Sequence, residues 1–168
     1  DKKILFKYKE GLICLTGGLQ SEIAQSYLYG GIKESQKVIN DNKNMFGLNN
    51  LFLEIQINKL VEQQRLNSLL LDISRKKFIR TIVTNPCHYL LKNEYESYMS
   101  LVSLKNKKFL HSVREIDHDL KNFYVKSPDA IWKDIKNIHK ESFFDTCRIG
   151  VRCNVNIKLR EIHLPIFT

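Results

Sequence analysis

Short apolar runs alternate with segments of helical periodicity through the first half of the sequence. The apolar runs are rich in leucine, isoleucine and valine and are bounded by glycine, asparagine or proline, a pattern typical of buried strands. They predict strands at residues 12–15, 51–57 and 79–84. Strands separated by helices at this spacing favour right-handed crossovers and a parallel sheet, so the pattern predicts an α/β fold.

Three helices are predicted between these strands. Ser21 is a suitable N-cap for a helix over residues 22–29, which the following glycine pair stops. A second helix is expected over about residues 33–45. The third, over about residues 61–75, carries apolar residues at helical spacing on one face. These apolar residues are Leu66, Leu69, Leu70 and Ile73.

The second half of the sequence is predicted to be mainly helical. Asn93 is a candidate cap for a helix that ends near Leu104. Ser127-Pro128-Asp129 combines an N-cap, a proline in the first turn and an acidic first-turn residue, which predicts the start of another helix. A last helix is expected over residues 141–152, and a weak strand over residues 155–159. The buried face of the helix after Ser127 is predicted to consist of Ile131, Ile135 and Ile138.

The third predicted strand runs directly into a polar turn, in the stretch T-I-V-T-N-P-C-H-Y-L at residues 81–90. Asn85-Pro86 marks a turn, because proline lacks an N–H and keeps the residue before it out of the helical region. His88 then lies just beyond the carboxyl end of the strand. Ligands and metal ions gather at that end of α/β sheets, so His88 is a candidate site residue.

This stretch resembles the T-N-D-x-H-Y-L segment of the PHP (polymerase and histidinol phosphatase) domain of bacterial DNA polymerase III alpha subunits. Four further stretches resemble that family in the same order. Pro86 departs from the pattern, because the family usually has a metal-binding aspartate there. The matching residues of the first stretch are Thr84, Asn85, His88, Tyr89 and Leu90. The other stretches are G-L-I-C-L-T-G-G-L-Q-S-E-I-A from Gly11, L-E-I-Q from Leu53 with Glu62-Gln63 and Asn67, F-Y-V-K-S-P from Phe123, and R-C-N-V from Arg152 with L-P-I-F from Leu164.

The resemblance implies part of an irregular (β/α) PHP barrel with mainly parallel strands, followed by a mostly helical region. Residues 1–90 would supply the carboxyl-terminal βα units of the barrel, and residues 91–168 a helical extension toward a polymerase palm. The chain begins at Asp1 and lacks the family's H-x-H and D-H-G motifs. We therefore expect an interior piece of a longer protein, whose first strand would expose a pairing edge.

The 168-residue chain carries a formal charge of +9, which suits a polyanionic partner such as DNA. An AT-rich genome would also produce many lysines, so charge alone leaves DNA contact open. The cysteines fit neither a C-x-x-C metal pattern nor a disulfide framework, and they indicate a reducing compartment. They lie at positions 14, 87, 147 and 153. With no apolar span or signal segment visible, we expect no membrane contact and a bacterial cytoplasmic location.

The resemblance also locates the candidate metal site. Metal-dependent phosphoesterases need several histidine and carboxylate ligands together. Of the family's ligand positions in this segment, His88 matches, Pro86 has lost its donor, and Gly17 or Gly18 stands where cysteine or histidine is common. His88 is therefore predicted to be the remnant of a metal site, held as a structural histidine by Tyr89 or a backbone carbonyl. Zn²⁺ or Mn²⁺ would be the family's metals.

Several other polar residues are given structural roles. Glu54 lies in an apolar strand and is expected to have a partner or to face the barrel mouth, because an unpaired buried carboxylate is costly. Glu62, Gln63 and Asn67 are expected to cap and brace the following helix. The remaining histidines, at positions 111, 118, 139 and 163, are predicted to lie on the surface.

The resemblance predicts a segment of a replicative DNA polymerase III alpha subunit, with no catalytic residues of its own and a structural role. Nucleotidyl transfer with Mg²⁺ would belong to another part of the parent enzyme. The implied partners are the rest of that subunit, template-primer DNA, the proofreading subunit and the sliding clamp. Alternatives are a metal-dependent PHP phosphoesterase or 3′–5′ exonuclease, a non-catalytic basic DNA-binding fragment, and a decaying gene fragment.

Overall fold

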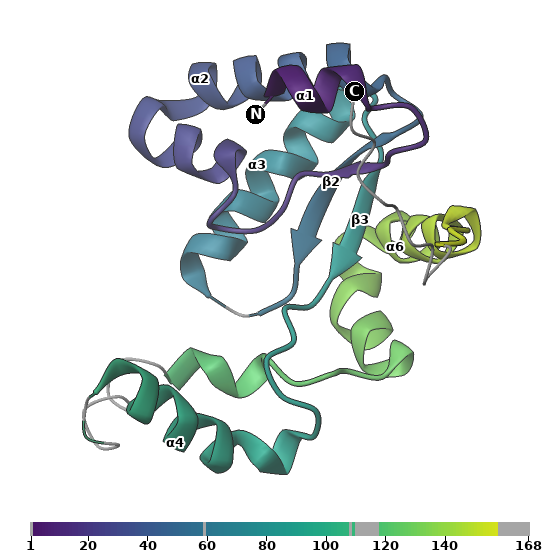
Figure 1. The fold of residues 1–168 in the computed structure, drawn as a ribbon. Helices are drawn as coiled ribbons and strands as arrows, with labels where there is room; N and C mark the ends of the chain where they lie inside the picture. The colour runs from purple at the N-terminus through teal and green to yellow at the C-terminus, as the bar shows by residue number, and fades with distance from the viewer. Residues whose placement is uncertain (1, 59, 108, 110–117, 158–168) are drawn as a thin grey trace, which may run out of the picture.

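Three parallel strands form the centre of the molecule (Figure 1). The computed structural model describes residues 2–58, 60–107, 109 and 118–157. The strands are β1 (Cys14–Leu15), β2 (Leu51–Gln56) and β3 (Thr81–Thr84), paired in the order β1-β2-β3. The predicted parallel sheet is confirmed, although β1 and β3 each begin two residues later than the sequence pattern indicates.

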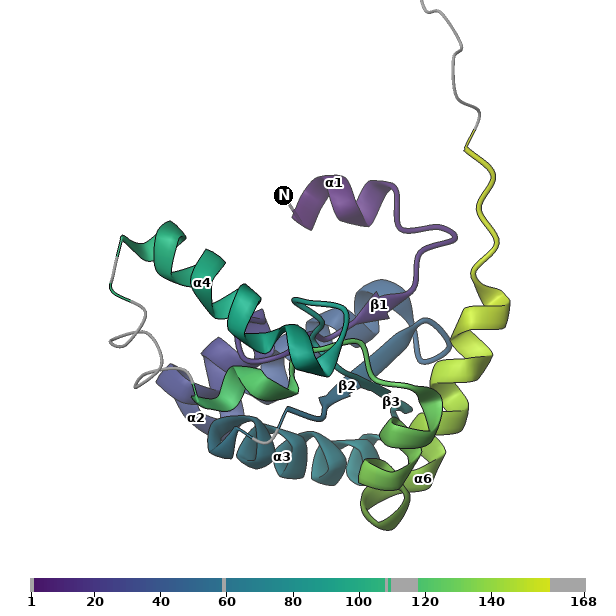
Figure 2. The same ribbon diagram turned by 90° about the horizontal axis from the view of Figure 1, so that it is seen from below.

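The two crossover helices are α2 (Glu22–Phe46) and α3 (Val61–Lys77). α2 is broken at Gly31, whose φ of 75° and ψ of −169° are not helical, so the predicted pair of helices around the glycines is confirmed. Both α2 and α3 lie on the same side of the sheet, as the view along the strands shows (Figure 2). Sequential strand order with the crossovers on one side is the arrangement of a (β/α) barrel, so the fold agrees with the predicted partial barrel.

The main core lies between the sheet and these helices. Alternate residues of β2 face α2 and α3 because side chains alternate across a strand. Leu51, Leu53 and Ile55 are at most 1% exposed. Ile135 of α6 (Pro128–Arg152) joins the same cluster. Its buried members are Ile23, Ala24, Ile39, Leu51, Leu53, Ile55, Leu66, Leu70, Leu71, Ile73, Ile79, Val83 and Ile135.

Helix α6 begins where the sequence predicts it. The Ser127 hydroxyl accepts a hydrogen bond from the backbone N–H of Ala130, and Pro128 occupies the first turn. The helix is interrupted at His139, where φ is −162° and ψ is 85°, so the prediction of a separate last helix is also confirmed. Ile138 lies in the last turn before this break and is 57% exposed, so the prediction that it is buried is wrong.

The second half of α6 covers the outer edge of β3. The Thr146 hydroxyl accepts a hydrogen bond from Val83 N–H at 3.0 Å. Its oxygen also lies 3.0 Å from Val83 O and 2.9 Å from Ser142 O, and its single hydrogen can be donated to one of the two. Helix α6 therefore covers this edge of the sheet and blocks the pairing of a further strand with β3 at Val83. β1, at the other edge, pairs only with β2 among the described residues.

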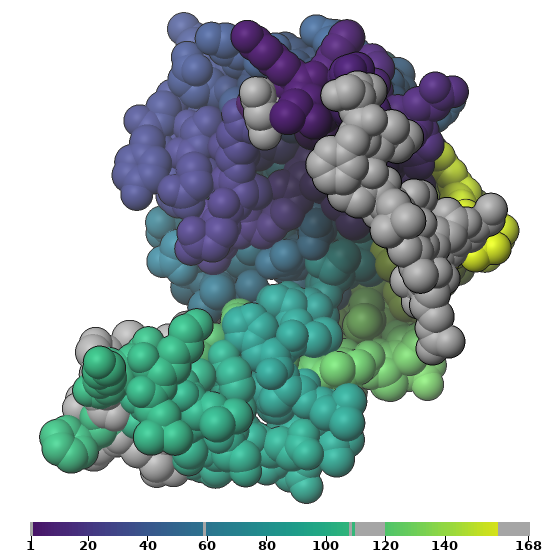
Figure 3. All heavy atoms as spheres, viewed as in Figure 1, coloured from purple at the N-terminus to yellow at the C-terminus, as the bar shows by residue number. Residues whose placement is uncertain are grey.

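Residues 85–107 and 118–125, which follow β3, form a separate and mainly helical lobe, coloured teal to green at the lower left of Figure 3. It contains η1 (Lys92–Glu94), α4 (Tyr95–Asn106) and η2 (His118–Asn122), and α1 (Lys2–Lys7) lies at the other end of the molecule. The predicted helical character of the second half is confirmed.

Two details at the ends of this second half differ from the sequence pattern. Asn93 is not a cap, because it lies inside η1 and the residue before α4 is Glu94. Residues 153–157 form no strand, and the rest of the weak strand predicted there lies outside the described residues. In the described part of the chain, no helix is long and apolar enough to cross a membrane.

Candidate functional site at the carboxyl end of the sheet

Glu54 joins all three strands at their carboxyl end. Its Oε1 accepts hydrogen bonds from the Thr84 hydroxyl at 2.6 Å and from Gln56 Nε2 at 3.0 Å. Its Oε2 accepts the backbone N–H of Gly17 at 3.1 Å, from the turn after β1. Glu54 is 9% exposed, so these donors replace most of the water that a carboxylate requires. The prediction that Glu54 has partners is confirmed.

The backbone around this carboxylate is fitted closely to it. The Thr16 hydroxyl accepts Glu54 N–H at 2.8 Å, which adds a second link between β1 and β2. Gly17 has a positive φ of 76°, a conformation that glycine adopts without strain. At Gly18, a side-chain Cβ would collide with the carboxamide of Gln56. The glycine pair therefore lets the turn after β1 approach the end of β2.

A second polar cluster connects β2 to helix α3. Asn67 Nδ2 donates to Gln56 O at 2.8 Å, and Asn67 Oδ1 accepts Gln56 N–H at 3.3 Å. Gln63 Nε2 donates to the same Oδ1 at 2.9 Å. The predicted bracing role of Gln63 and Asn67 is confirmed. The buried Gln63 Oε1 has no hydrogen-bond partner among the described residues.

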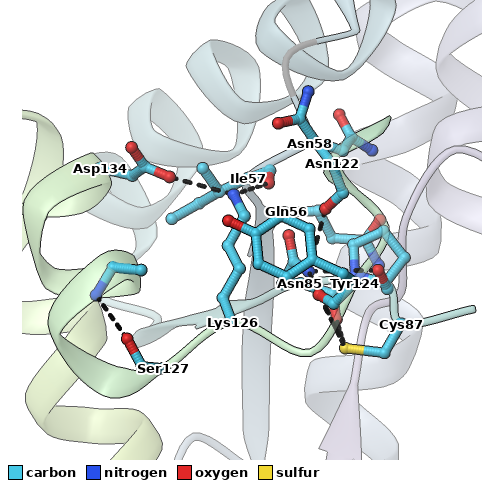
Figure 4. A network of polar contacts seen from close by, with 12 residues as sticks. Gln56, Ile57, Asn58, Asn85, Cys87, Asn122, Tyr124, Lys126, Ser127 and Asp134 are labelled. Atoms are coloured by element: carbon cyan, nitrogen blue, oxygen red, sulfur yellow. Dashed lines mark hydrogen bonds and ion pairs between the residues drawn. The ribbon is translucent and has the colours of Figure 1, made fainter. Parts of the chain in front are cut away.

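The turn after β3 pairs with residues 122–125 of the second half (Figure 4). Asn85 Nδ2 donates to Tyr124 O at 2.9 Å and to Asn122 O at 3.3 Å. The backbone N–H of His88 donates to Phe123 O at 2.7 Å, and Tyr89 forms an isolated parallel bridge with Tyr124. Two stretches about 35 residues apart in the sequence, T-N-P-C-H-Y-L and F-Y-V-K-S-P, are thus neighbours in space.

Lys126 is a buried cation at this end that sequence reasoning did not single out. Its side chain is 3% exposed, and its Nζ donates to Asp134 Oδ2 at 3.0 Å and to Ile57 O at 3.2 Å (Figure 4). The only signal in the sequence was its position between an aromatic run and the Ser127-Pro128 helix start. Through these two contacts, Lys126 connects the residue after β2 to the first turns of α6.

His88 lies at the surface beside an aromatic cluster. Its Nδ1 is 2.7 Å from the hydroxyl oxygen of Tyr98, and its ring packs against Phe123. The predicted structural contact exists, but the ring's partner is Tyr98 on α4, not Tyr89 or a backbone carbonyl. The Tyr89 hydroxyl instead donates to Leu120 O at 3.0 Å. Burial, reinforced by neighbouring tyrosines, raises the pKa of Tyr89, so its hydroxyl remains protonated.

His139 is not the surface residue that the sequence suggested. Its Nδ1 is 3.2 Å from the Thr81 hydroxyl and 2.9 Å from the Ser142 hydroxyl, and these two hydroxyls are 2.6 Å apart. The helix break brings His139 toward β3, which a helical pattern continued through this residue could not indicate. His111 and His163 lie outside the described residues, as does the side chain of His118.

A cavity of about 380 Å³ opens between the sheet end and the turn that carries His88. Its polar lining consists mainly of carboxamides, from Gln20, Gln56, Asn58 and Gln63, beside Pro86 and His88. In contrast, metal ions such as Zn²⁺ bind thiolate, imidazole and carboxylate ligands. Both oxygens of Glu54 already accept hydrogen bonds, and Pro86 supplies no side-chain donor. The residues at this end therefore do not fit a divalent metal ion.

The rest of the described chain offers no replacement metal site. No three histidine, cysteine, aspartate or glutamate side chains gather there in a group that could hold a metal ion. Cys14, the first residue of β1, is partly buried, and this burial raises the pKa of its thiol.

Comparison with known proteins shows which families this chain resembles. The PHP domain family matches residues 1–58. The DNA polymerase III subunit alpha of Treponema pallidum is 28% identical over 167 residues, which cover 99% of this chain and 14% of the relative. The corresponding subunit of Thermus aquaticus is 29% identical over 95% of this chain and 13% of the relative. That of Aquifex aeolicus is 30% identical over 79% of this chain and 12% of the relative.

The chain is similar to bacterial DNA polymerase III alpha subunits over nearly its whole length, and residues 1–58 match the PHP domain family. It spans about an eighth of the length of these polymerase subunits. The PHP match includes β1, α2 and β2 and ends at Asn58. α3, β3 and α6 lie beyond the PHP match, in the region that is similar to the polymerase subunits.

Proposed function

We propose that this chain is a structural part of the PHP region of a replicative DNA polymerase III alpha subunit, and that its metal site has been lost. Glu54 carries the proposal. A carboxylate at the carboxyl end of the strands is where a metal centre would need a ligand, yet both its oxygens accept hydrogen bonds from protein donors. The group that could hold a metal ion instead holds three strands together.

His88 and Pro86 fit the same proposal. His88 keeps the family's position but is directed to the Tyr98 hydroxyl, and Pro86 replaces the usual aspartate. We infer that His88 is a remnant of the metal site. Residues 1–90 would then serve as barrel scaffold, and residues 91–168 as a helical connection toward the polymerase palm.

The chemistry of the parent enzyme would take place elsewhere in the polypeptide. DNA-directed nucleotidyl transfer would use Mg²⁺ held by palm carboxylates, and this chain would contribute a surface for the rest of the subunit. Template-primer DNA, a proofreading subunit and a sliding clamp would be partners of the whole assembly. A cytoplasmic location follows from the same proposal.

Thermal unfolding of the 168-residue chain with Zn²⁺, Mn²⁺ or EDTA tests this proposal. A metal bound at a hundred times its dissociation constant would add about 2.7 kcal/mol to stability. That stabilisation would raise Tm by roughly 5–10 °C in a domain of this size. We expect instead the same Tm, within error, in all three conditions, both for the wild-type chain and for His88→Ala.

A metal-linked rise in Tm that His88→Ala abolishes would contradict the proposal and favour a metal-dependent phosphoesterase or 3′–5′ exonuclease. Incubation with a labelled single-stranded oligonucleotide and Mn²⁺ provides the matching activity test. The exonuclease alternative requires shortening of the labelled strand that EDTA stops, whereas a structural role predicts an intact strand.

A further inference from the structure

The amino end of the same sheet carries a very different cleft, of about 710 Å³. It lies between the start of β2, the start of β3 and the last turns of α6. Three of its lining residues are arginines, which come from two separate elements of the fold. The lining residues are Asn49, Arg80, Cys147, Arg148, Val151 and Arg152.

Two of the arginines are held in place by the sheet itself. The guanidinium groups of Arg80 and Arg152 lie 4.7 Å and 5.9 Å from the ring centre of Phe52. Arg80 also donates to Asn49 O at 3.3 Å, and Arg152 donates to the same oxygen at 2.9 Å. Stacking and hydrogen bonding restrict these long side chains, so little side-chain entropy remains to be lost when a ligand binds.

The third arginine is more exposed. Arg148 Nη1 donates to Asp145 Oδ1 at 2.8 Å while its side chain remains 69% exposed. Among the described residues, Asp145 is the carboxylate in contact with these arginines, and Arg80 lies 3.9 Å from it. Two of the three guanidinium groups thus lie near a single carboxylate and Arg152 pairs with none among the described residues, which leaves the cleft positively charged.

Each guanidinium group has five N–H donors. The described contacts use one donor of Arg148, one of Arg80 and two of Arg152. Attraction between basic side chains and a helix C-terminus could explain Arg148 and Arg152. It does not explain Arg80, which is the residue immediately before β3. Residues from separate elements converge here with unused donors.

We propose that this arginine cleft binds phosphate groups. Planar guanidinium groups match phosphate oxygens with paired hydrogen bonds, which a lysine cannot reproduce. Because the cleft is open to solvent, it can admit either a free phosphate compound or a phosphodiester of a nucleic-acid backbone. The overall charge of +9 would draw either ligand toward the chain. This site is independent of the fate of the metal site at the opposite end of the sheet.

Arg148→Gln is the direct test, because Arg148 is exposed and its removal leaves the Phe52 stack intact. The matched control is Arg75→Gln. Arg75 also forms an i,i+3 ion pair, with Asp72 at 3.1 Å, and is 67% exposed, but it lies on α3 away from the cleft. Arg148→Lys keeps the charge and removes the planar group. Circular dichroism of all variants verifies that each is folded.

Two probes distinguish the sources of phosphate: inorganic pyrophosphate by calorimetry, and a short labelled DNA duplex by fluorescence anisotropy. We expect Arg148→Gln to weaken binding about three- to tenfold, Arg148→Lys to weaken it less, and Arg75→Gln to leave it within about twofold. For DNA, the slope of log affinity against log salt should fall by about one unit in Arg148→Gln only.

Binding of either probe that depends on Arg148 supports the proposal, and the probe that binds identifies the source of the phosphate. The proposal is overturned if Arg148→Gln and Arg75→Gln behave alike with both probes. Failure of both probes to bind the wild-type chain at low salt would overturn it as well.

Discussion

The two ends of the sheet contain polar residues that are used in opposite ways. At the carboxyl end, the Glu54 carboxylate accepts hydrogen bonds from the Thr84 hydroxyl, the Gln56 carboxamide and the Gly17 N–H, and the nearby cavity is lined largely by carboxamides. At the amino end, three arginines line one cleft, and among the described residues a single carboxylate, Asp145, lies near two of them. At the carboxyl end, protein donors satisfy the carboxylate by hydrogen bonding. At the amino end, positive charge on the arginines remains available to a ligand.

This difference shows that the position of a polar cluster in a fold does not by itself reveal its use. In α/β barrels, the carboxyl end of the strands is the usual place for chemistry. Here the Glu54 carboxylate at that end is occupied by protein donors, which stabilises the turn after β1 and the ends of β2 and β3. The amino end usually serves stability, but here it has the unused hydrogen-bonding capacity that ligand binding requires.

Among the tests of this comparison, removal of the Glu54 carboxylate should have the largest effect on the free energy of unfolding. Glu54→Ala would leave the Gly17 N–H and the Thr84 hydroxyl without an acceptor, so we expect the free energy of unfolding to fall by about 3 kcal/mol. Urea denaturation followed by circular dichroism measures this change. Glu54→Gln, which keeps the volume but replaces one acceptor with a donor, should give an intermediate loss.

Glu62→Ala is the control, because Glu62 is an exposed acidic residue in the first turn of α3. Its removal should cost less than about 1 kcal/mol. If Glu54→Ala were no more destabilising than Glu62→Ala, the carboxylate would not hold the strand ends together. The contrast between the two ends of the sheet would then lose its basis.

Thr146 should give the next largest effect, because it attaches the arginine-bearing part of α6 to β3. Thr146→Val removes the hydroxyl that accepts Val83 N–H and should lower the free energy of unfolding by about 1–2 kcal/mol. Chemical denaturation provides the measurement. Thr146→Ser retains the hydroxyl and should lose clearly less; equal losses in both variants would mean that packing, not hydrogen bonding, secures α6.

The smallest effect is expected when one family ligand is restored. Pro86→Asp would place a carboxylate two residues before His88, but two donors do not complete a metal site. We therefore expect Zn²⁺ to change Tm by less than about 2 °C, since partial sites bind metal weakly. A larger, EDTA-reversible shift would show that the carboxyl end remains close to a working metal centre.

Much of the fold was accessible from the sequence because its determinants are local. The apolar runs predicted the three strands, Gly30-Gly31 predicted the break in α2, and Ser127-Pro128 predicted the start of α6. Capping and strand burial depend on residues close together in the chain, so their pattern is visible before folding.

The site was less predictable, because its contacts join residues far apart in the chain. The partners of Glu54 come from the turn after β1 and from β2 and β3, and His88 meets Tyr98 from α4. Polar residues such as Asn93 and His139 were assigned wrong roles because the backbone turns differently there than the simple pattern suggests.

By itself, the sequence determined the class of fold, the order of its elements and the relationship to DNA polymerase III alpha subunits. Periodicity, caps and short motifs encode these properties within neighbouring residues. The tertiary structure alone decided that Glu54 is occupied by hydrogen bonds, that Lys126 is buried beside Asp134, and that Arg80, just before β3, shares one cleft with two arginines of α6. The physical reason is that hydrogen bonding and charge depend on distances in space, which sequence separation does not fix.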